Sequence, residues 1–224
     1  ISLESLARWN HPEKGLVFPD YFIPVLEKNG LITELDLYIW EEVCKSIRSW
    51  IDNGYNIVPI SINVSRADIY SIDVPKTIKK LVEKYDIEPR LLEIEITESI
   101  YAEQYDTITE MVGKLRSYGF KVFMDDFGSG YSSLSSLNVM HFDTIKLDKS
   151  LIDYIGDRNG EKLLLHITQL LQSFGMTITA EGVETSDQVE FLKNLHCDDI
   201  QGYYFSKPLP VNEFEDFVRK HTGL

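Results

Sequence analysis

The segment Phe120-Lys-Val-Phe-Met-Asp-Asp-Phe-Gly-Ser-Gly130 contains the pattern on which the fold prediction depends. A helical pattern from Gln104 to Tyr118 stops at Gly119, and an apolar run from Phe120 to Asp125 follows it directly. The run ends in two carboxylates and a turn with two glycines, which permit positive φ angles. This order of helix, stop signal, short apolar run and polar loop predicts one β/α unit.

The same alternation of a short apolar run and a helical pattern recurs along the chain. The runs predicted as strands are Ser2 to Arg8, Ile57 to Asn63, Leu91 to Thr97, Phe120 to Asp125, Thr144 to Leu147, Thr177 to Glu181 and Asp199 to Tyr203. The helices predicted between them include Thr33 to Asp52 with Thr33 as its N-cap, Gln104 to Tyr118, Glu161 to Phe174 and Ser186 to Leu195. In a chain of 224 residues, seven such units favour a closed TIM-type (β/α)8 barrel over an open doubly wound sheet. The count is one short of eight, and the abrupt start at Ile1 favours a chain that begins inside the domain.

The composition limits the class of protein. With 43% hydrophobic residues the chain can bury a full core, and its length requires no more than one domain. No apolar run has the roughly 18 residues of a membrane helix, and the two cysteines lack metal-site spacing, so we expect a cytoplasmic domain without a membrane span. The net charge of −14 argues against binding DNA through a basic surface. An anionic substrate would therefore need local cations, such as bound divalent metals.

Polar side chains stand at the point where each predicted strand stops. In chain order they are Glu4, Asn63, Glu95, Asp125 with Asp126, Lys146, Glu181 and Gln201. The carboxyl-terminal strand ends of a parallel barrel meet at one mouth, so we expect these groups to converge there. Carboxylate and amide oxygens are hard ligands that suit Mg²⁺ or Mn²⁺.

Such a set of ligands predicts a two-metal site. Asp125 and Asp126 cannot point the same way from one extended strand, but at its frayed end they could address two different ions. Two ions about 3.5–4 Å apart could activate a water and neutralise the charge that develops on a phosphodiester. Lys146 would then hold the attacking water or a phosphate oxygen.

Each of these residues also has an ordinary structural interpretation, because a single Asp or Glu at a strand end is more often an N-cap or a solvated group. The loop after Asp125 could be a βα turn capped by Ser132 or Ser133. Glu95 is stronger evidence for a functional site, because the alternation along its strand places Glu93 and Glu95 on one face. Inside a barrel, such a carboxylate needs a cation or several donors.

Taken together, these segments resemble the EAL phosphodiesterase family from the first residues to the last. Glu4-Ser-Leu-Ala-Arg-Trp9 is similar to the family's signature, with Ser5 in place of the usual alanine and Ala7 in place of a usual leucine. The remaining blocks are Ser61 to Ser65, Glu95 to Glu98, Asp125 to Gly130, Ile145 to Asp148, Ala180 to Glu184 and Gln201 to Pro208. Their order and spacing are far more specific than any single block.

The resemblance implies a barrel whose first strand runs antiparallel to the others. That strand is missing from the chain, which would then be a single, N-terminally incomplete EAL domain over residues 1–224. Carried over position by position, the resemblance implies that one metal is bound by Glu4, Asn63, Glu95 and Asp125, and the second by Asp126 and Glu181. Glu181 would also act as base, and Lys146 would orient the water. Substrate would be contacted by Leu6, Arg8, Gln201 and Pro208, and the glycine-containing loop would be held by Glu98 and Glu184.

The same resemblance implies an enzyme that hydrolyses cyclic di-GMP to the linear dinucleotide pGpG in bacterial signalling, with two Mg²⁺ or Mn²⁺ ions. It also implies a homodimer, and a full-length protein with sensory or diguanylate cyclase (GGDEF) domains that could be membrane-anchored outside this segment. The main alternative is a catalytically silent cyclic di-GMP receptor on the same fold, which would be expected to have lost metal ligands or the lysine. The sequence also leaves open an unrelated metal-dependent phosphoesterase, or a partner-binding domain whose acidic cluster is merely solvated.

Overall fold

The computed structural model describes residues 3–55, 57–130 and 142–222, so the predicted caps Ser132 and Ser133 lie outside the described residues. The chain divides into two compact units. The first contains residues 1–95 and 114–121, and the second contains residues 96–113 and 122–224. Each unit is described by itself below.

The first unit contains parallel strands and a small hairpin. Strand β4 (Ile60–Asn63) pairs in parallel with both β1 (Leu3–Glu4) and β5 (Leu92–Thr97), and the last two residues of β5 belong to the second unit. Strands β2 (Trp9–His11) and β3 (Gly15–Val17) form an antiparallel hairpin.

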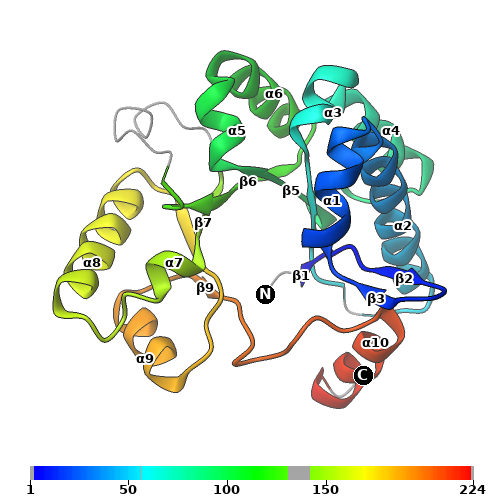
Figure 1. Ribbon diagram of the computed structural model, residues 1–224. Helices are drawn as coiled ribbons and strands as arrows, with labels where there is room; N and C mark the ends of the chain where they lie inside the picture. The colour runs from blue at the N-terminus through cyan, green and yellow to red at the C-terminus, as the bar shows by residue number, and fades with distance from the viewer. Residues whose placement is uncertain (1–2, 56, 131–141, 223–224) are drawn as a thin grey trace. The chain divides into compact units, whose positions relative to one another are not determined.

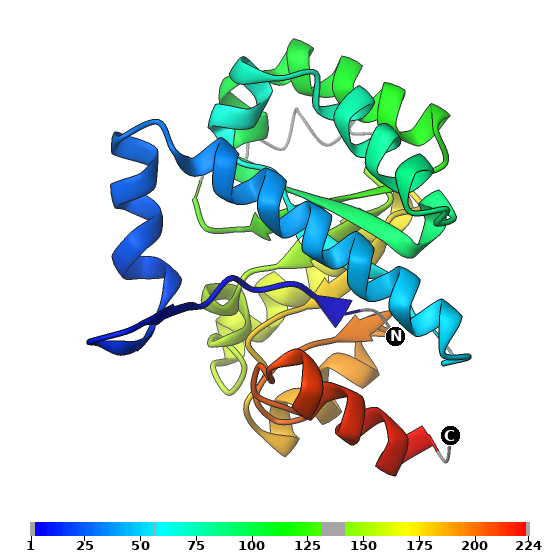
Figure 2. The ribbon, with the colours of Figure 1, turned by 90° about the vertical axis from the view of Figure 1, so that its right-hand side faces the viewer.

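The helices of the first unit are α1 (Pro19–Lys28), α2 (Ile32–Asp52), α3 (Arg66–Ser71) and α4 (Val74–Lys84), followed by the short 3₁₀ helix η1 (Pro89–Leu91). Figure 2 shows the long helix α2 with α1 joined to its N-terminal end. Helix α2 packs on β4 through a buried stripe that includes Ile32, Trp40, Cys44 and Ile47, at the spacing of one helical face. Gly54, with φ 73°, ends this helix in the left-handed conformation that glycine adopts without strain.

The second unit repeats the order of strand and helix. Its strands are β6 (Lys121–Phe127), β7 (Thr144–Leu147), β8 (Thr177–Ala180) and β9 (Asp199–Ile200), and neighbouring strands pair in parallel. Its helices are α5 (Glu98–Glu103), α6 (Tyr105–Ser117), α7 (Lys149–Ile152), α8 (Arg158–Ser173), α9 (Ser186–Asn194) and α10 (Val211–Thr222), of which α6 ends in the first unit. Helix α8 packs on β8 (Figure 1), and Leu164, Leu171, Ile145 and Ile178 are completely buried.

The strand order in the sheet is β1-β4-β5-β6-β7-β8-β9, which confirms the seven predicted strands and the parallel β/α class. Each described strand overlaps a predicted one, and Thr144–Leu147 agrees at both ends, but several other ends differ. The predicted strand Ser2 to Arg8 is described as Leu3–Glu4, and Asp199 to Tyr203 shortens to Asp199–Ile200 because the chain turns after Ile200. Strand β6 is instead two residues longer than predicted and continues to Phe127.

Several helical details were not predicted correctly. Thr33 is not the N-cap of α2, because the helix begins at Ile32 and its N-cap, Leu31, makes no side-chain capping bond. The hairpin β2–β3 and the short helices α3 and α7 were not predicted. Each is too short for its periodicity to stand out from the surrounding sequence. None of the helices in the described part of the chain combines the length and the apolar character needed to cross a bilayer.

Candidate metal centre at the strand ends

The carboxyl-terminal ends of β6, β7 and β8 in the second unit, which we call the carboxyl edge, bring together four charged side chains. Asp125 and Asp126 lie on β6, Lys146 lies on β7, and Glu181 directly follows β8. The register between β7 and β8 aligns Lys146 with Thr179, and the Glu181 N–H donates to the main-chain oxygen of Leu147 at 3.1 Å. Strand pairing therefore fixes the backbone from which these side chains project.

A β-bulge changes the direction of the two aspartates. Met124 pairs with Ile145 and Phe127 pairs with Leu147, so Asp125 and Asp126 together stand opposite the single residue Lys146. Asp126 has φ 56°, a left-handed conformation that costs a non-glycine residue roughly 1 kcal/mol. The expected alternation along an extended strand is broken here, which allows adjacent carboxylates to turn toward the same place.

Asp125, Asp126 and Glu181 form the acidic cluster of the second unit. One carboxylate oxygen from each lies within 4.8 Å of those of the other two. The side chains of Asp125 and Glu181 are only 12% and 17% exposed. Three hard oxygen donors at this spacing fit a divalent cation such as Mg²⁺ or Mn²⁺, whereas histidine and cysteine are absent from the cluster.

Lys146 is the cation that faces this cluster. Its Nζ lies 2.6 Å from Glu181 Oε1 and 3.2 Å from Asp125 Oδ1, and its side chain is only 3% exposed. The Lys146 ammonium opposes part of the negative charge of the cluster, and the low exposure of Asp125 and Glu181 limits how far water screens the repulsion between the carboxylates. Bound cations would remove that repulsion, and the lysine would remain within reach of a group held by Glu181.

The loop that follows the two aspartates is held by Glu98, at the start of α5. The Gly128 N–H donates to Glu98 Oε2 at 2.9 Å, and Glu98 is 1% exposed. Gly128 has φ 95°, and a Cβ at this position would lie 2.3 Å from Leu151 Cδ1. This bond is the kind expected of a residue that holds the glycine-containing loop, and the role of Glu98 toward that loop stays a prediction.

Glu184, predicted to hold the same loop, has other contacts. Its Oε1 accepts from Lys149 Nζ at 3.0 Å, and its N–H donates to Gln188 Oε1 at 2.8 Å. Glu184 therefore stabilises the segment between β8 and α9 in this structure, and its role toward the loop stays a prediction.

Gln201 lies at the end of β9, where the backbone is joined closely to the segment after Glu181. The Gln201 N–H donates to the Ala180 oxygen at 2.8 Å, and the Val183 N–H donates to the Gln201 oxygen at 3.1 Å. A Cβ on Gly202 would lie 2.1 Å from the Val183 oxygen. The predicted substrate residue Gln201 and the predicted base Glu181 thus stand on strand ends that are fixed to one another.

In the first unit, a second set of predicted ligands stands at the ends of β1, β4 and β5. Asn63 and Glu95 are register partners, and Glu4 pairs with Ser61, two residues before Asn63 on β4. Glu95 is 1% exposed. A carboxylate and an amide at neighbouring strand ends of one parallel sheet are brought together by the register itself.

The remaining predicted substrate contacts lie on more open parts of the molecule. Leu6 is 41% exposed, and the Arg8 guanidinium lies over the Phe18 ring at 5.4 Å while donating to the Ala7 oxygen at 2.8 Å. Pro208 is exposed. Asp148, at the end of the Ile145 to Asp148 block, is the N-cap of α7 and accepts from the Ser150 N–H at 3.0 Å, which is a structural role.

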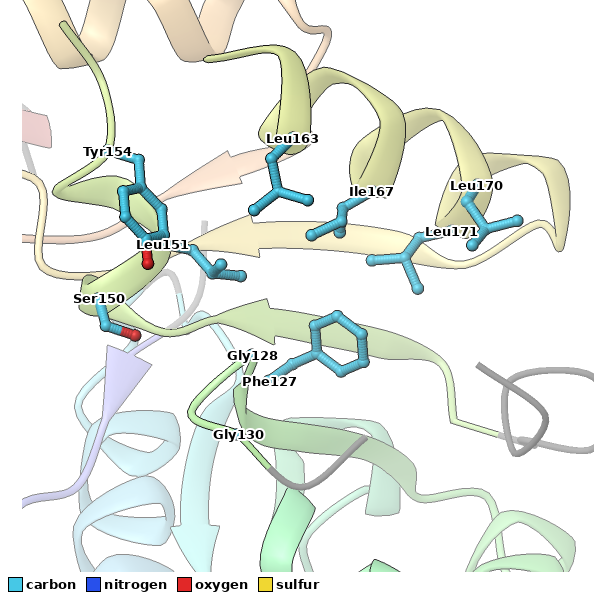
Figure 3. A pocket seen from close by; sticks show the side chains of 10 residues that line it. All are labelled: Phe127, Gly128, Gly130, Ser150, Leu151, Tyr154, Leu163, Ile167, Leu170 and Leu171. Carbon is cyan, nitrogen blue, oxygen red and sulfur yellow. The ribbon is translucent and has the colours of Figure 1, made fainter. Parts of the chain in front are cut away.

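A cavity of about 360 Å³ in the second unit lies apart from the charged cluster. Apolar side chains of α7 and α8 line it together with Phe127, Gly128 and Gly130, as Figure 3 shows. No carboxylate or lysine is among the lining residues. This cavity therefore does not provide the metal centre, although Gly128 connects it with the loop that follows Asp126.

Sequence reasoning missed one contact at the end of β4. The Trp40 Nε1–H donates to the Asn63 main-chain oxygen at 2.9 Å, from a side chain that is 1% exposed. Its position on the apolar stripe of α2 indicated burial, but the stripe does not say which strand the indole reaches. Trp40 holds the backbone from which the predicted ligand Asn63 projects.

The profile of the EAL domain family matches residues 1–208 of this chain. Cyclic di-GMP phosphodiesterase NbdA of Pseudomonas aeruginosa is 34% identical over 220 residues, which cover 98% of this chain and 28% of that protein. Oxygen sensor protein DosP of Escherichia coli is 37% identical over 217 residues, which cover 96% of this chain and 27% of that protein. The chain thus spans between a quarter and a third of the length of these relatives.

Among solved structures, the PaMucR phosphodiesterase in complex with c-di-GMP superimposes with a TM-score of 0.88 at 32% identity. The match covers 94% of this chain and 86% of that one.

Proposed function

The chain belongs to the EAL domain family, and we propose that it hydrolyses cyclic di-GMP to linear pGpG with the help of two divalent metal ions. The observation that carries this proposal is the convergence of Asp125, Asp126 and Glu181 beside the buried Lys146. A silent receptor would not need to maintain three crowded carboxylates and a lysine against their electrostatic cost. The names of NbdA and of the PaMucR complex agree with the same substrate.

The metal assignment follows the family's pattern. In the second unit, Asp126 and Glu181 would hold one ion, and Asp125 would be a ligand of the other. In the first unit, the family's pattern assigns Glu4, Asn63 and Glu95 as metal ligands. When bound, Mg²⁺ or Mn²⁺ ions supply an activated water and neutralise charge on the phosphate. The oxygen-only donor set fits these ions better than it fits zinc in a thiolate or imidazole site.

The residues of the chain perform the remaining steps. Glu181 accepts the proton of the attacking water, and Lys146, 2.6 Å from Glu181 Oε1, donates a hydrogen bond that orients the water. Arg8, Leu6, Gln201 and Pro208 bind the nucleotide. Glu98 holds the loop after Asp126 through the Gly128 N–H.

The assay is incubation of the purified chain with cyclic di-GMP and either Mg²⁺ or Mn²⁺, with the products separated by chromatography. We expect linear pGpG under at least one metal, none in EDTA and none from Asp125→Ala. Glu190→Ala, which removes an exposed carboxylate of α9, is the matched control and should keep full activity. Binding of cyclic di-GMP without any linear product under either metal would instead favour the receptor.

Metal binding is tested separately by calorimetric titration of Mn²⁺ or Mg²⁺. Glu4→Ala and Asp125→Ala should each weaken binding at least tenfold, because each removes a ligand. Unchanged metal binding in both variants would show that the strand-end carboxylates are merely solvated. Comparable turnover of simple phosphodiesters would indicate a different phosphoesterase, since a shaped substrate site discriminates strongly.

The wider setting is also part of the proposal. Because the relatives are three to four times longer than this chain, and one of them is named an oxygen sensor, we expect sensory or GGDEF domains in the full-length protein. Homodimerisation and a cytoplasmic location stay predictions, which gel filtration and cell fractionation would test.

A further inference from the structure

Two carboxyl groups meet inside the first unit, where α2 packs on α3. Asp36 lies on the buried stripe of α2, four residues after Ile32 and four before Trp40. Asp68, on α3, is completely buried. Asp36 Oδ2 and Asp68 Oδ1 are both buried, and no hydrogen-bond donor among the described residues reaches either atom.

None of the groups that shift the pKa of Asp36 in the described part of the chain is a cation, although a hydrogen bond with Ser65 lowers that pKa. Glu27 on α1 repels a negative charge on Asp36. Strand β4, on which α2 packs, contains no charged residue. Lys84 of α4 instead contacts Glu41, further along α2. No ion pair of the described residues includes Asp36. Burial first, and then the neighbouring Asp68, raise the pKa of Asp36 to about 8.

The pair is linked to the predicted metal ligand Asn63 by short contacts. Asp68 Oδ2 accepts from the Ser65 N–H at 2.8 Å and from the Ser65 hydroxyl at 2.7 Å. The Asp68 N–H in turn donates to Ser65 Oγ at 3.3 Å, and with the bond from the Ser65 N–H this forms a capping box whose N-cap, Ser65, lies two residues after Asn63. From the same face of α2, Trp40 binds the Asn63 main-chain oxygen at 2.9 Å.

We propose that Asp36 and Asp68 share one proton, and that the resulting hydrogen bond makes Asp36 a positioning residue for the segment between Asn63 and Asp68. Two facing carboxylate oxygens without a donor repel each other, whereas a carboxyl group and a carboxylate form a strong hydrogen bond. The α2 face then holds both ends of this segment, with Trp40 at Asn63 and Asp36 at Asp68. The consequence for metal binding rests on the proposed function, but the shared proton does not.

The direction of the pH effect follows from proton linkage. The folded chain holds the Asp36 proton up to about pH 8, whereas the unfolded chain releases it near the ordinary value of 3.8. The stability that this proton provides is therefore fully present at low pH. It declines as the pH rises from about 4 and is lost above about 8.

The direct test is carbon NMR of the aspartate carboxyl groups of the whole chain, recorded in EDTA from pH 4 to pH 9. We expect one aspartate to titrate near pH 8 and to disappear from the spectrum of Asp36→Asn. An Asp36 signal that titrates near pH 4 would overturn the shared proton.

The second test compares Asp36→Asn with Asp36→Leu by thermal unfolding in EDTA. An asparagine amide can donate permanently to Asp68, so Asp36→Asn should match the wild type near pH 4 and melt roughly 10 °C or more higher at pH 8.5. Leucine provides no donor, so Asp36→Leu should melt below the wild type at pH 5. A constant difference between Asp36→Asn and the wild type across this range would contradict the linkage.

Mn²⁺ titration with the same variants tests the positioning role. Asp36→Asn should bind Mn²⁺ as the wild type does, whereas Asp36→Leu should bind it several-fold more weakly. Equal affinity in all three proteins would overturn positioning. Failure of the proposed phosphodiesterase activity would leave the NMR and unfolding results intact, so the two hypotheses are decided separately.

Discussion

The two ends of the strands in the second unit carry similar aspartates in opposite circumstances. At the starts of the strands, which we call the amino edge, Asp143 Oδ2 accepts from the Val122 N–H at 2.9 Å and Asp198 Oδ2 accepts from the Ile178 N–H at 2.8 Å. Each of these residues precedes a strand and binds the neighbouring one. At the carboxyl edge, Asp125, Asp126 and Glu181 instead crowd one another beside Lys146.

This difference separates a stabilising use of carboxylates from the one that we propose to be functional. At the amino edge, charge-assisted bonds to backbone N–H groups hold adjacent strands in register. At the carboxyl edge, like charges and a strained backbone at Asp126 cost stability that a bound cation would restore. Stability alone therefore does not explain the second set, whose placement is the one expected of a reaction centre in a barrel.

The largest expected effect is on turnover. Lys146→Ala should keep cyclic di-GMP binding but lose roughly 100- to 1000-fold in kcat, because the lysine orients the attacking water and is no metal ligand. Steady-state kinetics together with a binding measurement in EDTA check this. Lys162→Ala, at an exposed position of α8, is the control. Parallel loss of binding and turnover would assign Lys146 to substrate binding instead.

The next effect concerns the backbone of the carboxyl edge. Gly202→Ala should lower the free energy of unfolding by roughly 3 kcal/mol, since its Cβ would meet the Val183 oxygen at 2.1 Å and force the strand ends apart. Urea unfolding measures this. Gly113→Ala in α6, where a Cβ meets no atom within 4 Å, should be neutral or slightly stabilising. Similar losses in both variants would mean that the close approach at Gly202 is unimportant.

A smaller loss is expected at the amino edge. Asp143→Ala removes the acceptor for the Val122 N–H and should lower the free energy of unfolding by about 1–2 kcal/mol. Metal affinity should stay unchanged, because the substitution is at the opposite ends of the strands. If Mn²⁺ binding weakened as strongly as in Asp125→Ala, the division into a structural and a functional edge would be wrong.

The smallest effect has the opposite sign. Asp126→Asn should raise the free energy of unfolding in EDTA by about 1 kcal/mol, because it removes one of three crowded charges while asparagine also tolerates φ 56°. The same substitution should weaken metal binding. Unfolding with and without Mn²⁺ measures both consequences. A variant less stable than the wild type in EDTA would show that the cluster is already compensated within the protein.

The sequence alone determined the class of fold and indicated the family. Apolar runs that alternate with amphipathic helices can bury themselves only in a β/α arrangement, so seven parallel strands could be predicted. The polar residue at each strand end was also visible, since it interrupts an apolar run. The order and spacing of these blocks were enough to indicate the EAL family.

Only the tertiary structure decided how these residues act together. The bulge that turns Asp125 and Asp126 toward Glu181 depends on pairing with β7, so the strand pattern of β6 alone predicted divergence. Asp36 and Asp68 lie far apart in the sequence, and each looks like an ordinary polar residue of a helix until α2 packs on α3. Local sequence specifies the conformation of each segment, but the pKa of a carboxyl group is set by the groups that folding places beside it.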